Sequence, residues 1–183
     1  MRLDAMKRAD VVRRPGSWSV LGAVLAAGVL LPMAGWSQSS GAPVSFANPL
    51  PGERVTSRFG ERVDPFSAAR VTHTGVDVHG KPTSRVRAAA SGIIEVATAR
   101  YGGDDRHGTV VVVDHGRRLK TFYSHLDLLA VTAGDRVGKG DLLGIPGTTG
   151  RVTGRHLHFE VWENGTPVDP ARFVEDWREP SAQ

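Results

Sequence analysis

From about residue 48 onward, short runs of Val, Ile, Thr and aromatic residues alternate with clusters of Gly, Asp and Pro. No window longer than about ten residues in this part sustains the 3.6-residue apolar period of an amphipathic helix. Short apolar runs bounded by turn residues are typical of strands, which we predict at 92–97, 109–114, 120–125 and 156–162. The pattern therefore predicts a mainly β domain.

The residues between these runs indicate how the strands pair. Residues 115–118 (HGRR) separate the second run from the third, and Asn164-Gly165 follows the last run. Both are good hairpin connections, so the predicted sheet is antiparallel. Residues 85–97 and 131–147 together resemble the half-barrel of biotinyl and lipoyl carrier domains. We therefore expect an antiparallel sheet with a small half-barrel and an open cleft over the sheet.

The start of the chain has the three-part layout of a secretory signal peptide. Residues 1–14 are positively charged overall, residues 18–33 (WSVLGAVLAAGVLLPM) are uncharged and apolar, and small and polar residues follow. The apolar run is shorter than the roughly 20 residues that a comfortable membrane span needs. Because the bulky Trp36 makes cleavage near Ser37 unfavourable, an uncleaved inner-membrane anchor remains the alternative.

The sequence thus divides into four segments. Residues 1–37 form a signal peptide or N-terminal membrane anchor, residues 38–47 a polar linker, residues 48–176 one folded domain and residues 177–183 a C-terminal tail. We expect an exported protein. It is either periplasmic, or associated with the inner membrane through residues 18–33 and facing the periplasm.

The formal net charge of +4 does not indicate nucleic-acid binding, because five of the 23 basic residues lie in the first fourteen positions. Without residues 1–36 the chain has 18 basic and 17 acidic residues, a net charge of +1. A nearly neutral domain lacks the basic surface that nucleic acid requires. The chain also has no cysteine, which excludes structural disulfides, thiolate zinc sites and a cysteine nucleophile.

Three of the seven histidines, together with Asp77 and Glu160, form two candidate metal-binding motifs, His73-Thr-Gly-Val-Asp77 and His156-Leu-His158-Phe-Glu160. In a strand, residues i and i+2 share a face about 7 Å apart, so His156 and His158 project to the same side. An extended chain would separate His73 from Asp77 by roughly 13 Å, too far to share one ion. We therefore predict a kink at Gly75, where a bulge or turn is tolerated.

These motifs together supply imidazoles and a carboxylate for a metal ion. Two imidazoles and one carboxylate with an open fourth position are the usual ligands of hydrolytic zinc. Zinc lowers the pKa of a bound water to about 7 and polarises a scissile carbonyl. Such a site needs only a proton acceptor and a group that steadies the oxyanion, and histidine can serve as either. One histidine of the HxH pair can bind the metal while the other meets the bound water or the substrate.

From about residue 49 to residue 174 the chain resembles the lysostaphin/LytM-type metallopeptidases. The resemblance includes VTSRFGERVDP, HTGVDVHG, AAASG, VVVDHG, TFYSHL, GDRVGKGDLLGIPGTTG, TGRHLHFEVWENG and the closing PVDP. It implies one zinc ion per domain, bound by His73, Asp77 and His158. It also implies that His125 and His156 flank the metal-bound water as general base and transition-state stabiliser, and leaves open which of the two takes the proton.

The remaining histidines and Glu160 have plainer interpretations. We expect His115 to be structural, His79 to lie at the cleft edge without binding metal, and Glu160 to support a ligand or face solvent. His107 stays undecided. It lies in YGGDDRHG (101–108), a longer loop than the Gly-Tyr-Gly-Asn-like connection usual in the family, which we place at the cleft rim. The aromatic residues are expected to pack in the core or on a sheet face, and none is counted as catalytic: Phe59, Phe122, Tyr123, Phe159 and Trp162.

The resemblance implies a zinc-dependent endopeptidase that hydrolyses peptide bonds in peptidoglycan cross-links or stem peptides. The absence of a wall-targeting repeat favours D-alanyl to diaminopimelate cross-links in the periplasm over glycyl bridges. The alternative is a catalytically inactive LytM-like domain that activates a cell-wall amidase, although such domains have lost metal ligands. A lipoyl or biotinyl carrier is disfavoured, because Lys139 lies in a poor context for modification. Peptidoglycan is thus the expected partner, with a regulatory cell-wall protein as a second one.

Overall fold

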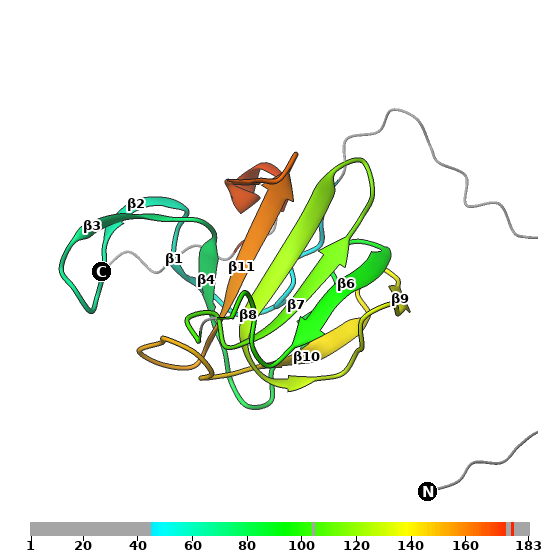
Figure 1. Ribbon diagram of the computed structural model, residues 1–183, viewed down its shortest axis with the longest axis horizontal. Coiled ribbons are helices and arrows are strands. Elements are labelled where there is room, and N and C mark those ends of the chain that lie inside the picture. Colours follow the sequence, from blue (N-terminus) through cyan, green and yellow to red (C-terminus); the bar gives the residue numbers. More distant parts are fainter. Residues whose placement is uncertain (1–44, 104, 175–176, 178–183) are drawn as a thin grey trace, which may run out of the picture. The chain divides into compact units, whose positions relative to one another are not determined.

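The computed structural model describes residues 45–103, 105–174 and 177, and within these ranges the chain is almost entirely β (Figure 1). The strands, in chain order, are β1 (Val55–Ser57), β2 (Gly60–Val63), β3 (Arg70–His73), β4 (Val76–His79), β5 (Val86–Arg87), β6 (Gly92–Thr98), β7 (Thr109–Asp114), β8 (Leu119–Leu129), β9 (Arg136–Val137), β10 (Leu142–Pro146), β11 (His156–Glu163) and β12 (Thr166–Val168). One short 3-10 helix, η1 (Pro170–Arg172), follows. No helix in the described ranges is long and apolar enough to cross a membrane. The apolar segment 18–33 lies outside the described residues.

Most strands belong to one antiparallel sheet, as the sequence predicts. Its order is β1-β4-β11-β8-β7-β6-β9, with β12 beside β11 and with β10 beside both β5 and β8. Strands β2 and β3 form a separate hairpin that projects from the β1 side (Figure 1). Strand β10 joins β5 to the end of β8, while β9 pairs with β6. The two half-barrel segments therefore meet at one side of the sheet, without closing into a barrel.

All four strands predicted from apolar runs are present. Strands β6, β7 and β11 agree with the predicted ranges to within one residue at each end. Strand β8 runs to Leu129, four residues beyond its predicted end at His125. The extension arises because β8 changes partners along its length: its first part pairs with β11 and β7, and Leu126–Leu129 pair with β10.

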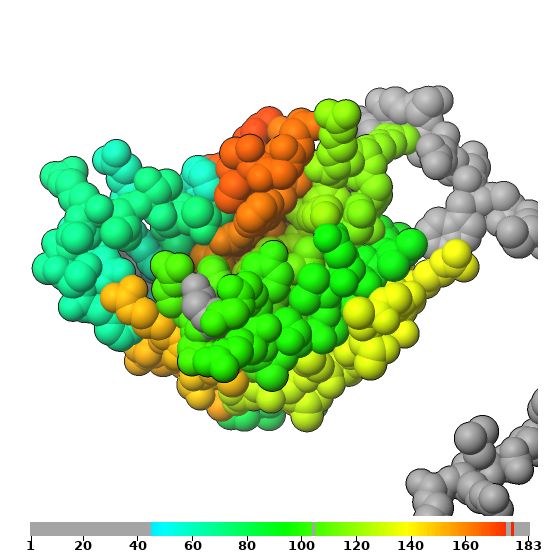
Figure 2. Space-filling model, in the orientation of Figure 1, coloured from blue at the N-terminus to red at the C-terminus, as the bar shows by residue number. Residues whose placement is uncertain are grey.

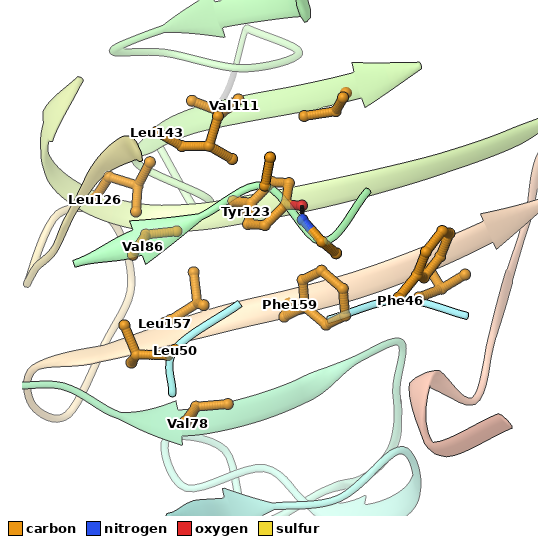
Figure 3. Close-up of a cluster of buried hydrophobic side chains, with 14 of the residues drawn as sticks. Phe46, Leu50, Val78, Val86, Val111, Tyr123, Leu126, Leu143, Leu157 and Phe159 are labelled. Atoms are coloured by element: carbon orange, nitrogen blue, oxygen red, sulfur yellow. Dashed lines mark hydrogen bonds between the residues drawn. The ribbon is translucent and has the colours of Figure 1, made fainter. Parts of the chain in front are cut away.

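One face of the sheet carries the hydrophobic core (Figure 3). On β8 and β11, Tyr123, Leu157 and Phe159 are fully buried on this face. Burying a large apolar side chain contributes roughly 1.5–3 kcal/mol. The core includes residues from both ends of the domain, since Phe46, which the sequence places in the linker, is buried, and Trp177, placed in the tail, packs on Phe159 with ring centroids 6.0 Å apart.

The opposite face of the same strands carries polar groups and a smaller apolar cluster. Because successive side chains alternate, Phe122 on β8 and Trp162 on β11 lie on this second face, away from Tyr123 and Phe159. His158 has the same parity as Trp162, so it shares this face. The chemistry of the molecule is therefore concentrated on one side of a sheet whose other side is its core.

Candidate metal centre and active site

A bend at Gly75 brings His73 and Asp77 together, as predicted. Strand β3 ends at His73 and pairs with β2, whereas β4 begins at Val76 and joins the main sheet, so the chain changes direction between the two. A Cβ at position 75 would collide with the carbonyl oxygen of Phe159 and would approach Cγ of Glu160 to 2.9 Å. The backbone can pass this close to β11 only because residue 75 is glycine.

The register of β4 against β11 places the third residue. Asp77 is directly opposite His158, and His79 is directly opposite His156. Side chains of directly opposed residues on neighbouring antiparallel strands lie on the same face with Cβ atoms about 4.5–5.5 Å apart. The two motifs, separated by some eighty residues in sequence, therefore meet because two neighbouring strands pair in this one register.

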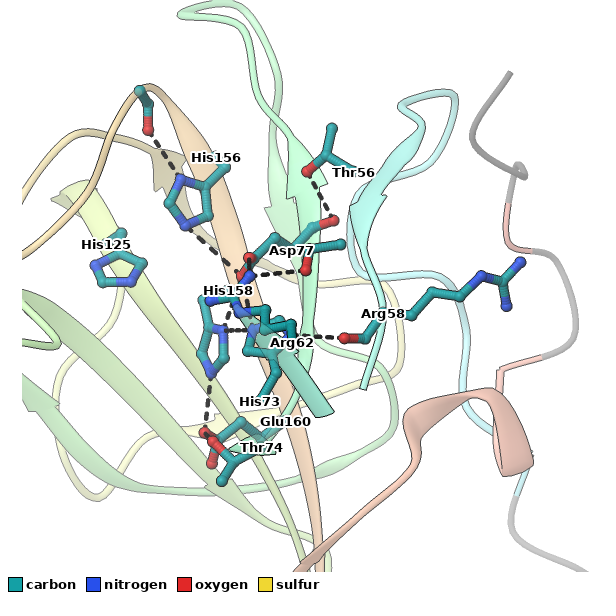
Figure 4. Close-up of polar contacts among 12 residues, drawn as sticks. Thr56, Arg58, Arg62, His73, Thr74, Asp77, His125, His156, His158 and Glu160 are labelled. Carbon is teal, nitrogen blue, oxygen red and sulfur yellow. Dashed lines mark hydrogen bonds and ion pairs between the residues drawn. The ribbon is translucent and has the colours of Figure 1, made fainter. Parts of the chain in front are cut away.

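Three nitrogen and oxygen atoms converge on one point (Figure 4). His73 Nε2 lies 3.1 Å from Asp77 Oδ1 and 3.0 Å from His158 Nδ1, and His158 Nδ1 lies 2.9 Å from the same carboxylate oxygen. All three residues are buried. Within the described part of the chain these residues form a group that could hold a metal ion.

The outer contacts of the two rings fix which nitrogen carries hydrogen. His73 Nδ1 lies 2.7 Å from the carbonyl oxygen of Arg58, and His158 Nε2 lies 2.9 Å from Glu160 Oε1. Both partners only accept, so these two nitrogens donate. In the neutral rings, His73 Nε2 and His158 Nδ1 therefore hold lone pairs that face each other and Asp77 Oδ1. Three converging lone pairs require a cation between them, which is the donor set that a divalent metal ion fits.

The pKa values agree with a site built for positive charge. Burial lowers the pKa of His158, but hydrogen bonds to Asp77 and Glu160 and the charges of these carboxylates outweigh it and raise the pKa to about 9. For Asp77, burial raises the pKa, yet the hydrogen bonds and charges of His158 and His73 hold it well below its ordinary value. A proton or a metal cation is thus strongly favoured among these groups.

His125 reaches the site through an irregularity in β8. Its φ is +63°, a left-handed conformation that is uncommon for a residue other than glycine, and the β7–β8 register shifts between Thr109 and Val111. Regular alternation would place His125 on the core face with Tyr123. The bulge turns it to the face that carries His158 instead, and such strained positions cluster at functional sites.

His125 and His156 lie side by side over this centre, with ring centroids 4.8 Å apart (Figure 4). Each donates from Nδ1 to a backbone carbonyl, His125 to Thr149 at 2.9 Å and His156 to Gly154 at 2.8 Å. Each neutral ring therefore keeps a lone pair on Nε2. Burial, together with the charges of His156 and His158, lowers the pKa of His125 to about 3, so that its ring is neutral at neutral pH.

Arg62, which the sequence did not single out, and Glu160, which was expected to support a ligand or face solvent, hold the predicted ligands in place. Arg62 on β2 donates to Asp77 Oδ2 at 2.8 Å and to Ser57 Oγ at 2.7 Å, which leaves Oδ1 of Asp77 for the centre. Glu160 accepts from His158 and also from Thr74 and the Trp162 indole. Arg62 lies within the VTSRFGERVDP motif, but a lone arginine there gives no signal of its partner.

The centre opens into a cavity of about 190 Å³. One wall is the β2–β3 hairpin and another is the loop before β11, whose surfaces meet at the teal and gold regions of Figure 2. Arg151 of this loop forms two hydrogen bonds with Asp64 of the hairpin, at 3.0 and 3.1 Å, and its guanidinium lies 4.2 Å from the centre of the Phe66 ring. These contacts join the two walls across the cleft.

The remaining histidines, His79, His107 and His115, lie outside the convergent group. His79 is half-buried at the end of β4, with Nδ1 3.5 Å from Glu53 Oε2, and takes no part in the convergent group. His115 bonds to the carbonyl of Ser91 and to the Thr121 hydroxyl, which is a structural role. His107 lines the cavity, so its loop does contribute to the rim of the cleft.

A mainly β domain with a buried His-Asp-His group beside two further histidines in a cleft has the features expected of a metallohydrolase. The chain belongs to peptidase family M23, whose sequence model matches residues 71–170. This confirms the predicted resemblance to lysostaphin/LytM-type metallopeptidases.

Two curated relatives show how far the similarity extends. The chain is 38% identical over 122 residues to the DD-carboxypeptidase/endopeptidase Mpg of Neisseria meningitidis serogroup B, covering 67% of this chain and 27% of the relative. It is 34% identical over 117 residues to the peptidoglycan DD-endopeptidase ShyA of Vibrio cholerae, covering 63% of this chain and 26% of the relative. The chain thus spans about a quarter of the length of these relatives.

Solved structures share the fold. A zinc-containing peptidase from Vibrio cholerae matches with a TM-score of 0.60 and 32% identity, covering 68% of this chain and 37% of that one. The catalytic domain of lysostaphin from Staphylococcus simulans matches with a TM-score of 0.58 and 27% identity, covering 66% of this chain and 91% of that one. The antiparallel fold predicted from the sequence is therefore the fold of this family.

Proposed function

We propose that this protein is a zinc-dependent endopeptidase that hydrolyses peptide bonds in peptidoglycan. The observation that carries the proposal is the convergence of three lone pairs, from His73, Asp77 and His158, directly beside the paired rings of two further histidines in an open cleft. Membership of peptidase family M23 supports it, as do relatives named peptidoglycan DD-endopeptidases.

Zinc suits the donor set better than magnesium or calcium, which prefer oxygen ligands. His73 and His158 would hold it through Nε2 and Nδ1, and Asp77 through Oδ1. When bound, zinc would polarise the scissile carbonyl and make a water nucleophilic at neutral pH. Arg62 keeps the other oxygen of Asp77 occupied, and Glu160 keeps the His158 ring in the tautomer that offers Nδ1 to the ion.

His125 and His156 would accept the proton of the attacking water and stabilise the negative charge that develops on the carbonyl oxygen. Both present an Nε2 lone pair toward the cleft, because their Nδ1 atoms donate to backbone carbonyls. One ring would take a proton from the attacking water, and the other, when it carries a proton on Nε2, would donate a hydrogen bond to the developing oxyanion. The geometry is symmetrical enough that either histidine can act as the base.

Two relatives suggest the bond. ShyA and ShyC of Vibrio cholerae are named peptidoglycan DD-endopeptidases, and the chain is 34% and 35% identical to them. A D,D bond of this kind is the link from D-alanine to diaminopimelate in peptidoglycan cross-links. We therefore propose this cross-link as the substrate, reached after export through the signal peptide or anchor in residues 1–37.

The proposal is tested with the zinc-loaded protein lacking residues 1–37 and purified diaminopimelate-type peptidoglycan. The released muropeptides are analysed with and without a zinc chelator. We expect chelator-sensitive conversion of cross-linked dimers to monomers, and the new chain ends identify the bond.

Absence of release by zinc-loaded protein would instead favour the alternative, an inactive domain that activates a cell-wall amidase. That alternative is the weaker one, because such domains have lost metal ligands, whereas His73, Asp77 and His158 are all present and convergent here. Adding a cell-wall amidase to the same assay separates the two: an activator would increase amide cleavage at the glycan end of the stem peptide.

A further inference from the structure

A second hollow lies on the same face of the sheet as the metal centre. It has a volume of about 150 Å³, and its lining includes the aromatic side chains of Tyr101, Phe122 and Trp162 and the charged side chains of Glu95 and Lys120. The Tyr101 ring packs edge-on against Phe122, with centroids 5.1 Å apart. Phe122 is buried beneath, whereas Tyr101 and Trp162 are half-buried and reach the surface.

The hollow neighbours the metal centre along β11, with the buried Glu160 between them. His158, Glu160 and Trp162 alternate on one face of the strand, and Glu160 accepts hydrogen bonds from both neighbours. His107 joins the two cavities on the other side, since it lines the metal cleft and its ring lies 5.4 Å from Phe122. The metal cleft and the hollow are therefore neighbours on one face of the sheet, close enough for one extended ligand to reach both.

We propose that this hollow binds a sugar ring of the glycan strand whose stem peptide occupies the metal cleft. The inference rests on the proposed function. Trp162 lies four positions after His158 on β11, a span of roughly 13 Å. A stem peptide has about four residues between its cross-link and its sugar, and in extended form they cover about the same distance.

The chemistry of the lining favours a neutral, partly apolar ligand. Lys120 and Glu95 form an ion pair across the hollow, so their charges offset each other while their outer hydrogen-bonding groups stay accessible. The C–H face of a sugar packs on aromatic rings such as Tyr101 and Trp162, and its hydroxyl and acetamido groups need polar partners at the rim. Stem-peptide residues with free carboxylates would find no unopposed cation among these lining residues. The small volume accommodates one ring rather than a larger ligand.

Two cross-linked substrates test the proposal, one carrying its disaccharides and one freed of them by an amidase. Tyr101→Ala is the main variant because the Tyr101 ring borders the hollow. We expect it to lower kcat/KM about tenfold on the disaccharide-bearing substrate, as loss of one aromatic contact would, and to leave the glycan-free peptide within about twofold. Leu128→Ala, which removes an exposed apolar side chain from the far part of β8, is the matched control and should change neither.

Equal losses on both substrates would overturn the proposal and place peptide in the hollow, and no loss on either would also overturn it. A binding measurement keeps the test independent of catalysis. The disaccharide of N-acetylglucosamine and N-acetylmuramic acid should shift the indole N–H resonance of Trp162 in the protein, assigned with Trp162→Phe, and Tyr101→Ala should abolish the shift. If the protein cleaves neither substrate, the proposed function fails, whereas an absent shift means that the sugar site fails.

Discussion

His156 and His158 are two residues apart on one strand, yet their ring nitrogens have different tasks in the proposed mechanism. His158 offers Nδ1 to the ion, whereas His156 Nε2 lies 3.7 Å from Asp77 Oδ1, outside the convergent group. We predict that His158→Ala loses zinc and activity together. His156→Ala should retain zinc and lose about 10²–10⁴-fold in kcat, the usual contribution of a general acid or base.

Zinc content by elemental analysis and muropeptide release by the same preparations check this prediction. His79→Ala is the control, since it removes the neighbouring histidine of β4 that lies opposite His156. It should change zinc content little. Full activity in either the His156 or the His158 variant would contradict the assigned roles.

The Glu160 carboxylate accepts hydrogen bonds from three neighbouring side chains. It can do so only while both of its oxygens are acceptors. His158, Thr74 and the Trp162 indole all donate to its two oxygens. Glu160→Gln would turn one oxygen into a donor that faces another donor, so we predict a 10- to 100-fold loss in zinc affinity, typical of losing a residue that orients a ligand. Competition with a fluorescent zinc chelator measures it.

Glu163→Gln provides the matched control for this change. Glu163 lies on the same strand, but its ion-pair partner in the described residues is the exposed Arg172 at 3.9 Å, and not a predicted metal-binding residue. The zinc affinity of the Glu163→Gln variant should remain within about twofold of wild type, since exposed ion pairs of this kind contribute little to stability. A Glu160 variant with unchanged affinity would show that the His158 tautomer does not depend on this carboxylate.

At the scale of elements, the bend between β3 and β4 decides whether the metal centre forms. Gly75→Ala would place a methyl group against the backbone of Phe159 and beside Glu160, so β4 must move away from β11. We predict a loss of about 1–3 kcal/mol in unfolding free energy, as in other overpacked sites, together with loss of zinc binding. Urea denaturation and zinc titration measure the two effects.

Gly138→Ala is the control, because a Cβ there would meet nothing closer than 3.4 Å. It should retain zinc binding and nearly all its stability. If Gly75→Ala bound zinc normally, the close approach of β3–β4 to β11 would not be required for the site.

The elements also show what the sequence could and could not predict. Apolar runs bounded by turns located β6, β7 and β11, because strand alternation is a local property. The kink at Gly75 followed from distance alone, since His73 and Asp77 could not otherwise share an ion. The position of His125 could not be predicted, because its orientation depends on a bulge in β8 that the flanking residues do not reveal.

Contacts between side chains far apart in the sequence were also not predicted. The contacts of Arg62 with Asp77 and of Arg151 with Asp64 join residues 15 and 87 positions apart. A single sequence gives no signal for such pairs, which depend on the packing of the β2–β3 hairpin beside the main sheet. The residues of the metal centre and the supporting position of Glu160 were among the sequence-based expectations, whereas the long-range contacts of Arg62 and Arg151 were not.

At the scale of the whole domain, the two faces of one sheet have different roles, since one face packs the core and the other carries the candidate sites. Its core face carries Tyr123 and Phe159, and its other face carries the metal centre and the proposed sugar site. Side-chain alternation along β8 and β11 makes this possible, since each strand supplies both faces. Substitutions on the face that carries the metal centre should thus alter function at small cost in stability. Substitutions in the buried polar network beside the core should instead lower stability.

Such a network runs from His115 through Thr121 to Tyr123 and the backbone of residue 89. His115 Nδ1 donates to Ser91 at 2.9 Å, so in the neutral ring Nε2 accepts from the Thr121 hydroxyl at 2.7 Å. Thr121 has one hydrogen, hence the Tyr123 hydroxyl, 2.9 Å away, donates to it, and Ala89 N–H donates to Tyr123. Every donor in this chain is matched only while His115 is neutral.

Burial lowers the pKa of His115 in the folded protein, against opposing effects of the Ser91 carbonyl and Asp114. The unfolded chain, with a histidine pKa of about 6.5, therefore binds more protons than the folded chain just below this pH. The stabilising contribution of His115 is complete above about pH 6.5 and is lost as the pH falls toward the folded pKa, by at most about 1.4 kcal/mol per pH unit.

We predict that the unfolding free energies of wild type and His115→Gln converge between about pH 7 and 5. Urea denaturation of both proteins in the presence of a chelator measures the difference, in which the titrations of the metal-site histidines cancel. A difference that stays constant over this range would show that the network does not require a neutral His115.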